Sequence, residues 1–389
     1  MPAFSIVEEP FDGVRRIAVL RGGGIGDLIF AMPAIDALAA TYPRAEIVLL
    51  GSPVHAALLA GRPSSVSRVE VLPIARGVRE AKRERPDPVE TAEFGVRVRR
   101  HGPVDLGVQL HGGGRFSNPF LIALAPRHSV GSATEDATPL ERTMPYVYYQ
   151  HEVVRGLEIA ALAGAEPVTL EPRLAITAAE RSAIERHLPV GGSPLAVVHP
   201  GASDPRRRWP GERFARVIEG LLEGGASVRL IGDASERPLA AAIARSVDWD
   251  RPGSASRLQV LAGSLSLGES AALLEAADVV VANDSGPRHL AQAVGAPTVG
   301  VFWFGNVVNA APFSRRRHRV HLSFTVNCPV CGADVTQVGW TAKRCEHDVS
   351  FVTDVEVAPV LADALALMAM SSPRSDTRRA LGSRSRRAG

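Results

Sequence analysis

The sequence predicts an α/β protein built from two doubly wound, Rossmann-like domains that face each other across a cleft. Apolar runs of strand type alternate with helix-like stretches in two successive series, as in parallel sheets covered by helices. The segment 166–175 is proline-containing and poorly periodic, as a linker would be, and the linker between the two series is expected near 165–193. In each series a loop of small residues follows a buried strand, where such sheets bind their ligands.

The first domain is expected at 1–172. It begins with a buried strand in RRIAVL, the glycine loop RGGGIGD and a helix that starts in LIFAMPAI, and the strand AEIVLLG completes one β-loop-α-β unit. The further elements predicted are a helix at 53–60, a short strand near Val69, a loop or helix pair at 76–100, a strand at 105–111 and a helix at 151–163.

The second domain is expected at 173–354, where the series restarts with the strand and loop PLAVVHPGAS. The uncharged stretch 290–313 belongs to this series, and its prolines and asparagines favour a buried core over a membrane span. Apolar residues at helical spacing predict a closing helix at 355–370. The Ser/Arg-rich tail at 371–389 is expected to be disordered.

The composition excludes several classes of protein. The chain has 389 residues with 46% apolar content, which is enough for two or three domains with cores. Six arginines and one aspartate in the last nineteen residues outweigh the net charge of +3, so the rest of the chain is mildly acidic. We therefore expect no nucleic-acid partner. Few cysteines and an acidic leader without a signal-peptide pattern favour a cytoplasmic location.

The first glycine loop predicts an anion site with a carboxylate in it. Gly24 and Gly26 stand between a buried strand and a helix, where backbone amides and the helix dipole attract negative charge. A dinucleotide fingerprint would need a glycine where Asp27 stands, and no acidic residue ends the second strand. The nicotinamide interpretation is therefore disfavoured. Asp27 is either a carboxylate stabilised by the helix dipole or a general base.

A second anion site is predicted at 283–287. Asp284, Ser285 and Gly286 follow the strand ADVVVA and precede a helix. Ser285 can cap that helix, whose first amides suit a diphosphate. His289 can donate to a phosphate or pack in the core.

The arginine run 206–208 follows the first strand of the second domain. Such a run is usually a solvated surface. Because ligands bind at the carboxyl ends of the strands, one of these arginines can instead neutralise a departing phosphate in place of a metal.

Together these segments resemble glycosyltransferase family 9, the ADP-heptose:lipopolysaccharide heptosyltransferases and their relatives. The matching segments are IAVLRGGGIGDLIFAMPAIDAL, VVHPGASDPRRRWPGERFARVI, LIGDASE and ADVVVANDSGPRHLAQAVGAPTVGVF, in order across about 280 residues. The resemblance implies a GT-B fold, with the acceptor held by the first domain and a nucleotide sugar by the second. It also implies inverting transfer without a metal ion, and a closing helix that packs on the first domain.

The resemblance also implies roles for individual residues. Asp27 matches the family's general base, with Gly24 and Gly26 beside it, and Arg207 stands where the family commonly has a lysine near the phosphates. The residues that match the contacts to the donor diphosphate and sugar are Asp284, Ser285, Gly286 and His289.

Two further segments match the family's pattern less closely. The nucleoside contact is assigned to Glu236, with Asp233 as the alternative. The segment LHGGGR resembles the acceptor-side Q-G-x-x-[KR] motif, with His111 in place of glutamine and Arg115 in the basic position.

A cysteine cluster stands outside these motifs. Cys328, Cys331, Cys345 and His347 have the spacing C-x2-C-x13-C-x-H, which is compatible with a tetrahedral structural zinc site. Reduced thiols are the alternative, and a redox CxxC is disfavoured because no thioredoxin-like pattern surrounds it. No cofactor is expected to be needed for catalysis.

The sequence thus predicts an inverting glycosyltransferase that moves heptose from ADP-heptose onto a saccharide acceptor such as lipopolysaccharide core. The alternatives are a transferase that uses another nucleotide sugar, a nucleotide-sugar epimerase or hydrolase, and a non-catalytic sugar-nucleotide binding protein. If the acceptor is lipid-linked, the basic tail can contact the inner membrane surface. A solubilising tail is the other interpretation.

Overall fold

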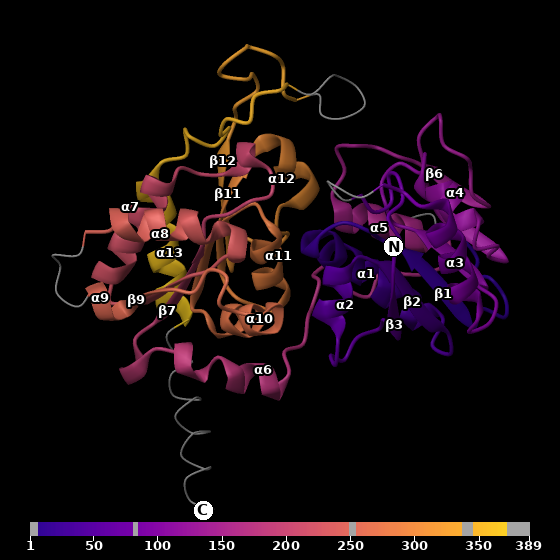
Figure 1. The fold of residues 1–389 in the computed structure, drawn as a ribbon, viewed down its shortest axis with the longest axis horizontal. Coiled ribbons are helices and arrows are strands. Elements are labelled where there is room, and N and C mark those ends of the chain that lie inside the picture. Colours follow the sequence, from indigo (N-terminus) through magenta and orange to yellow (C-terminus); the bar gives the residue numbers. More distant parts are fainter. Residues whose placement is uncertain (1–6, 81–84, 249–253, 337–344, 372–389) are drawn as a thin grey trace, which may run out of the picture. The chain divides into compact units, whose positions relative to one another are not determined.

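A computed structural model describes residues 7–80, 85–248, 254–336 and 345–371 of the chain. These residues form two compact units, Met1–Ala175 and Ile176–Gly389 (Figure 1). The division falls three residues after the predicted domain boundary at 172/173. The predicted tail lies outside the described residues from 372 onward. The cleft expected between the domains stays a prediction.

The first unit contains one parallel sheet with the strand order β3-β2-β1-β4-β5-β6. Its strands are β1 (Arg16–Leu20), β2 (Glu46–Gly51), β3 (Arg68–Val71), β4 (Leu106–Gln109), β5 (His128–Ala133) and β6 (Arg142–Pro145). Its helices are α1 (Ile25–Thr41), α2 (Pro53–Leu59), α3 (Pro88–Arg99), α4 (Ser117–Ile122) and α5 (Glu152–Ala161).

Alternate residues of β1 pack on opposite faces of this sheet. Ala18 and Leu20 share a core with Phe94 and Val98 of α3, while α1 packs against α5. Strands that are buried on both faces are apolar throughout, which explains why RRIAVL and AEIVLLG read as uninterrupted apolar runs.

The second unit contains a parallel sheet with the order β12-β11-β10-β7-β8-β9. Its strands are β7 (Leu195–His199), β8 (Ser227–Leu230), β9 (Leu258–Val260), β10 (Val279–Asn283), β11 (Thr298–Trp303) and β12 (His318–Ser323). Its α-helices are α6 (Ala178–Ala183), α7 (Gly211–Glu223), α8 (Arg237–Ser246), α9 (Ser254–Arg257), α10 (Leu267–Ala276), α11 (Gly286–Ala293), α12 (Phe304–Ala310) and α13 (Val357–Ser371). Its short 3-10 helices are η1 (Glu185–His187), η2 (Val190–Gly192), η3 (Pro205–Arg207) and η4 (Ala234–Glu236).

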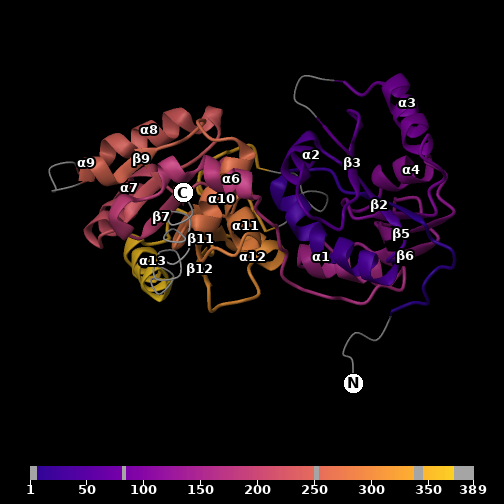
Figure 2. The ribbon, with the colours of Figure 1, turned by 90° about the horizontal axis from the view of Figure 1, so that it is seen from below.

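Two predictions about this unit can be compared with the structure. The segment 166–175 contains no helix or strand, whereas the later part of the linker expected near 165–193 contains α6, which begins with a capping box of Thr177 and Glu180 and packs against α10. The closing helix was expected to pack on the first domain. Instead, Val360 and Leu367 of α13 belong to the core of the second unit. Helix α13 packs against α7 and β10 of that unit (Figure 2). Its periodic apolar stripe fits that sheet face.

The strand orders show where polar loops meet. In each sheet the order reverses once, between β1 and β4 in the first unit and between β7 and β10 in the second. Because all the paired strands are parallel, the loops that follow β1 and β4 emerge at one edge, and so do the loops after β7, β8 and β10. Such reversal points are where open α/β sheets bind ligands.

Candidate active site

The glycine loop after β1 is shaped by contacts that only glycine permits. Gly23 has a φ of +89°, and a Cβ there would lie 2.3 Å from the Asp27 carboxylate. A Cβ on Gly22 would lie 2.3 Å from the carbonyl oxygen of Val78. Gly24 is the N-cap residue of α1, and Gly26 lies in the first turn of that helix. The loop therefore brings backbone amides close to the carboxylate of Asp27.

Asp27 makes a helix-capping contact and also exposes part of its carboxylate. Its Oδ2 accepts a hydrogen bond of 2.8 Å from the Gly24 amide, and its Oδ1 accepts one of 2.7 Å from Nη2 of Arg21. The side chain is 43% exposed. Burial works against ionisation, but the Arg21 guanidinium and the Gly24 amide outweigh it and lower the pKa of Asp27. Asp27 is thus an ionised, accessible hydrogen-bond acceptor at neutral pH.

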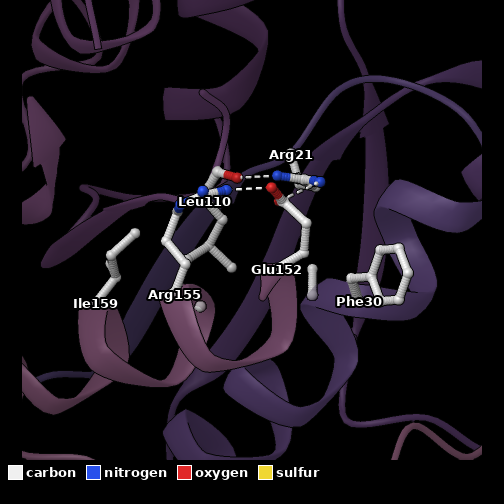
Figure 3. A pocket seen from close by; sticks show the side chains of 8 residues that line it. Arg21, Phe30, Leu110, Glu152, Arg155 and Ile159 are labelled. Carbon is white, nitrogen blue, oxygen red and sulfur yellow. Dashed lines mark hydrogen bonds and ion pairs between the residues drawn. The ribbon is translucent and has the colours of Figure 1, made fainter. Parts of the chain in front are cut away.

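Arg21 ties Asp27 to the start of α5. Its guanidinium is buried and also pairs with Oε2 of Glu152 at 3.1 Å (Figure 3), while Nη1 donates to the Leu110 carbonyl. Arg155 pairs with the other oxygen of Glu152. The adjoining pocket in Figure 3 has about 10 Å³ of space, which is about enough for one water molecule and far too little for a sugar.

Two histidines hold the backbone of the glycine loop. His111 Nδ1 accepts from the Gly22 amide at 3.1 Å, and burial together with the nearby Arg21 lowers the pKa of His111 to about 4. His55 Nδ1 lies 3.3 Å from the Ser52 amide, so Nε2 carries the proton and donates to the Gly24 carbonyl at 2.8 Å. Both rings are neutral supports of the loop. No sequence motif pointed to His55, which lies on the short helix α2.

Arg115 lies apart from this network, in the loop between β4 and α4. Its side chain is 63% exposed, pairs with Asp136 at 3.3 Å and lies over the ring of Phe116. An exposed guanidinium of this kind suits a contact to a ligand at the edge of the sheet.

In the second unit, Asp284 anchors the loop between β10 and α11. Its buried carboxylate accepts from Asn306 at 2.8 Å and from Nη1 of Arg207 at 3.2 Å, and its Oδ1 lies 3.1 Å from Nε2 of His289. Burial alone would raise the pKa of Asp284, but His289 and Arg207 outweigh it and keep that pKa well below its usual range. Asp284 therefore fixes two of the predicted donor-binding side chains.

His289 is a neutral donor in this arrangement. Burial and the adjacent Arg288 lower the pKa of His289 to about 4. Arg288 Nη2 donates to its Nδ1 at 2.5 Å, so the proton is on Nε2, which faces Asp284. Arg288 itself is fully buried beside the ring of Phe302.

The predicted capping role of Ser285 is wrong in one respect. Ser285 occupies the N-cap position of α11, but its side chain makes no capping hydrogen bond. Its hydroxyl lies 3.3 Å from Nδ1 of His199, the last residue of β7. Nε2 of His199 in turn lies 3.2 Å from the carboxylate of Glu236.

The arginine run is only partly a solvated surface, since Arg208 alone of the three is exposed. Arg206 is buried and paired with Asp204, and Arg208 donates to the Ala202 carbonyl. Arg207 pairs with Asp284, and its side chain stays 22% exposed. Arg207 is therefore the member of the run that joins the loop after β10.

The structure also separates the two candidates for the nucleoside contact. The Asp233 carboxylate caps η4 through the amides of Ser235 and Glu236. The carboxylate of Glu236 reaches His199, and a Cβ on Gly201 would lie 1.5 Å from its Oε1. This geometry favours Glu236, because its carboxylate faces the loop after β7.

The cysteine cluster is assembled within the second unit. The ligand atoms of Cys328, Cys331, Cys345 and His347 all lie within 4.8 Å of one another. Cys345 Sγ lies 3.4 Å from Cys331 Sγ and 3.2 Å from His347 Nδ1. Amides of Cys331 and Val330 point at Cys328 and lower the pKa of its thiol to about 6. These separations fit a tetrahedral ion with Zn–S bonds of about 2.3 Å.

The fold is that of a two-domain α/β protein with a loop of small and polar residues at the reversal point of each sheet. The model of glycosyltransferase family 9 (heptosyltransferase) matches residues 115–332, and the chain belongs to this family. It is accordingly a glycosyltransferase, as the sequence predicted.

Known proteins agree with this assignment. Lipopolysaccharide heptosyltransferase 1 of Pseudomonas aeruginosa is 26% identical over 81% of this chain and 86% of its own. The structure of E. coli ADP-heptose lps heptosyltransferase II has a TM-score of 0.68 at 19% identity and covers 92% of this chain and 99% of that one. The iron-containing dodecameric glycosyltransferase TibC of enterotoxigenic E. coli has a TM-score of 0.50 at 15% identity, over 96% of this chain and 78% of that one. The predicted GT-B fold is confirmed.

The uncharged stretch 290–313, predicted to be buried core and not a membrane span, can also be compared with the structure. This stretch forms much of α11, then β11 and α12, and β11 is buried throughout. Among the residues that the structure describes, no helix is long and apolar enough to cross a membrane.

Proposed function

We propose that the protein transfers heptose from ADP-heptose to a saccharide acceptor such as lipopolysaccharide core, with inversion at the anomeric carbon and without a catalytic metal ion. The observation that supports this most is the family match at 115–332. The chain is also similar to lipopolysaccharide heptosyltransferases over most of their length. The arrangement of polar residues in each unit agrees with such a reaction.

The second unit is proposed to bind the donor. The amides at the start of α11, at Ser285 and Gly286, have no carbonyl partner within the helix. Together with the Ser285 hydroxyl they suit a diphosphate, because the helix dipole favours negative charge there. Arg207, held by Asp284, adds a positive charge that stabilises the departing diphosphate. Glu236 accepts hydrogen bonds from hydroxyls of the nucleoside, and His289, held by Asp284, lies beside the sugar.

The first unit is proposed to hold the acceptor and supply the base. The acceptor oxygen attacks the anomeric carbon, the bond from that carbon to the phosphate oxygen breaks, and the acceptor proton passes to Asp27. The carboxylate is ionised and partly exposed, so it can accept this proton. The glycine loop at Gly24 and Gly26 leaves room beside it, and Arg115 contacts the acceptor.

The substitution Asp27→Asn tests the proposal. It keeps the size of the side chain and removes the base, so turnover of ADP-heptose with an acceptor should fall about 100-fold or more. Donor affinity, measured by calorimetry with ADP, should stay within about threefold, because Asp27 belongs to the first unit and no donor contact is proposed for it. Turnover that is unchanged in Asp27→Asn contradicts the assignment of the base.

The same assays separate the alternatives. Tight binding of UDP or GDP in place of ADP would keep the fold and the mechanism but change the donor. Sugar products that form without an acceptor would indicate an epimerase or a hydrolase. Nucleotide binding without any turnover would indicate a non-catalytic binding protein.

The cysteine cluster supports a second proposal, a structural metal ion held by Cys328, Cys331, Cys345 and His347. Three thiolates and one imidazole suit zinc, and iron is the alternative, since TibC is described as iron-containing. The ion would join the CxxC turn to the chain at 345–347. It would add stability to this loop and would take no part in the transfer reaction.

Elemental analysis and thiol titration test the metal. Purified protein should contain about one ion per chain, and Cys331→Ser should lose it. The thiols of the wild type should react fully only after denaturation or treatment with a strong chelator. Metal-free wild-type protein whose three cysteines react at once would contradict the proposal.

A further inference from the structure

A single buried imidazole joins two of the proposed donor contacts. His199 ends β7, Glu236 ends η4, and Ser285 precedes α11, so the three residues come from three different loop regions of the second unit. His199 is 3% exposed. Its Nε2 lies 3.2 Å from Glu236 Oε2, and its Nδ1 lies 3.3 Å from Ser285 Oγ.

The imidazole acts as a rigid spacer because its ring is planar and its two nitrogens are both engaged. A carboxylate at neutral pH only accepts hydrogen bonds, so Nε2 must carry a proton toward Glu236. Nδ1 is then the group that meets the Ser285 hydroxyl. Moving either partner disturbs the same ring, and the ring has little room to move because it is buried.

Other contacts on both sides limit alternative positions. Glu236 Oε2 also accepts from the Asp233 amide at 2.9 Å, and Gly201 leaves the space that the carboxylate occupies. Ser285 does not cap its own helix, so its hydroxyl is directed by His199 and not by the amides of α11. His199 is therefore a side chain that contacts both the nucleoside contact and the diphosphate contact.

We infer that His199 is a positioning residue that couples the nucleoside and diphosphate contacts of the donor site. This inference rests on the proposed donor roles of Glu236 and Ser285. It predicts that the two contacts contribute to nucleotide affinity cooperatively. A residue that only fills the core would leave them independent, since Glu236 and Ser285 would then act as separate sites.

A double-mutant cycle measures this coupling. The dissociation constant of ADP is determined by calorimetry for the wild type, Glu236→Gln, Ser285→Ala and the double variant. The losses should be non-additive by at least about threefold, because residues in one hydrogen-bonded network interact. The same cycle in a His199→Leu background should be additive. His199→Gln, whose amide keeps a donor toward Glu236, should retain more affinity than His199→Leu.

The outcomes distinguish a failure of the coupling through His199 from a failure of the proposed donor site. Additive losses in the wild-type background, with tight ADP binding by the wild type, would overturn the coupling while leaving the donor site intact. Coupling that persists in His199→Leu would likewise overturn the role of His199. A wild type that binds neither ADP nor UDP would instead refute the proposed function. The first cycle needs no variant of His199, so a misfolded His199→Leu protein does not prevent the test.

Discussion

At the scale of single residues, the structure shows which side chains a linear motif can reveal. Asp27, Asp284 and Ser285 stand within short glycine-containing loops between a strand and a helix, so local spacing marks them as candidates and the family resemblance supplies their expected roles. Arg21, His199 and Glu152 act through partners that are far away in the chain. The Arg21–Glu152 pair spans 131 residues and the His199–Ser285 pair spans 86. No local pattern identifies such pairs, because only the folded sheet brings them together.

The contact between Arg21 and Asp27 leads to a prediction about pH. Arg21 helps to lower the pKa of Asp27, and the proposed base works only when ionised. Arg21→Met removes that cation, so the pKa of Asp27 should rise and the acid limb of the kcat/KM profile should move to higher pH. Arg21→Lys keeps a cation and should leave the limb near its wild-type position.

Steady-state rates from pH 4 to 8 would check this expectation, with thermal melts to confirm that each variant folds. An acid limb that is the same in Arg21→Met and in the wild type would show that Asp27 is not the group that titrates. The test is informative even if absolute rates fall, because the position of the limb is independent of the amount of active enzyme.

At the scale of elements, periodicity located helices better than it located their partners. The closing helix was expected at 355–370 and is observed at Val357–Ser371. Its assignment to the first domain followed the family resemblance and differs from the structure, in which its buried residues belong to the second core. An apolar stripe predicts that one side of a helix is buried against another element. It does not identify that element, because any apolar sheet face can pack on the stripe.

The packing of α13 leads to a stability prediction. Leu367 is 1% exposed in the second core, so Leu367→Ala should lower the free energy of unfolding of that unit by about 2 to 5 kcal/mol. Met370, on the same helix, is 55% exposed, and Met370→Ala should cost less than about 0.5 kcal/mol.

Urea titration followed by tryptophan fluorescence is the suitable measurement. All four tryptophans lie beyond residue 200, so the signal reports on the second unit. Equal transitions for Leu367→Ala and the wild type would show that α13 does not contribute to this core. A loss as large in Met370→Ala would mean that the exposed face of the helix is covered.

At the scale of the whole molecule, two series of alternating strands and helices were sufficient to predict two parallel-sheet units. Their strand orders place one reversal point in each unit, and each reversal point carries one half of the proposed chemistry. The donor half contains the cations Arg207 and Arg288 next to a helix N-terminus. The acidic groups near that loop, Asp284 and Glu236, are engaged with His289, Arg207 and His199.

This distribution of charge predicts that catalysis needs no divalent cation. In many nucleotide-sugar enzymes a metal ion neutralises the leaving diphosphate, but here the α11 amides and Arg207 occupy that position in the proposed site. Transfer from ADP-heptose should therefore keep its kcat/KM within about twofold when EDTA replaces divalent salts in the assay. Cys331→Ser protein, assayed alongside, controls for chelation at the cysteine cluster. A tenfold loss that Mg²⁺ restores in both proteins would contradict the metal-independent mechanism. A loss confined to the wild type would instead trace the effect to the cluster, because only that protein is expected to hold an ion there.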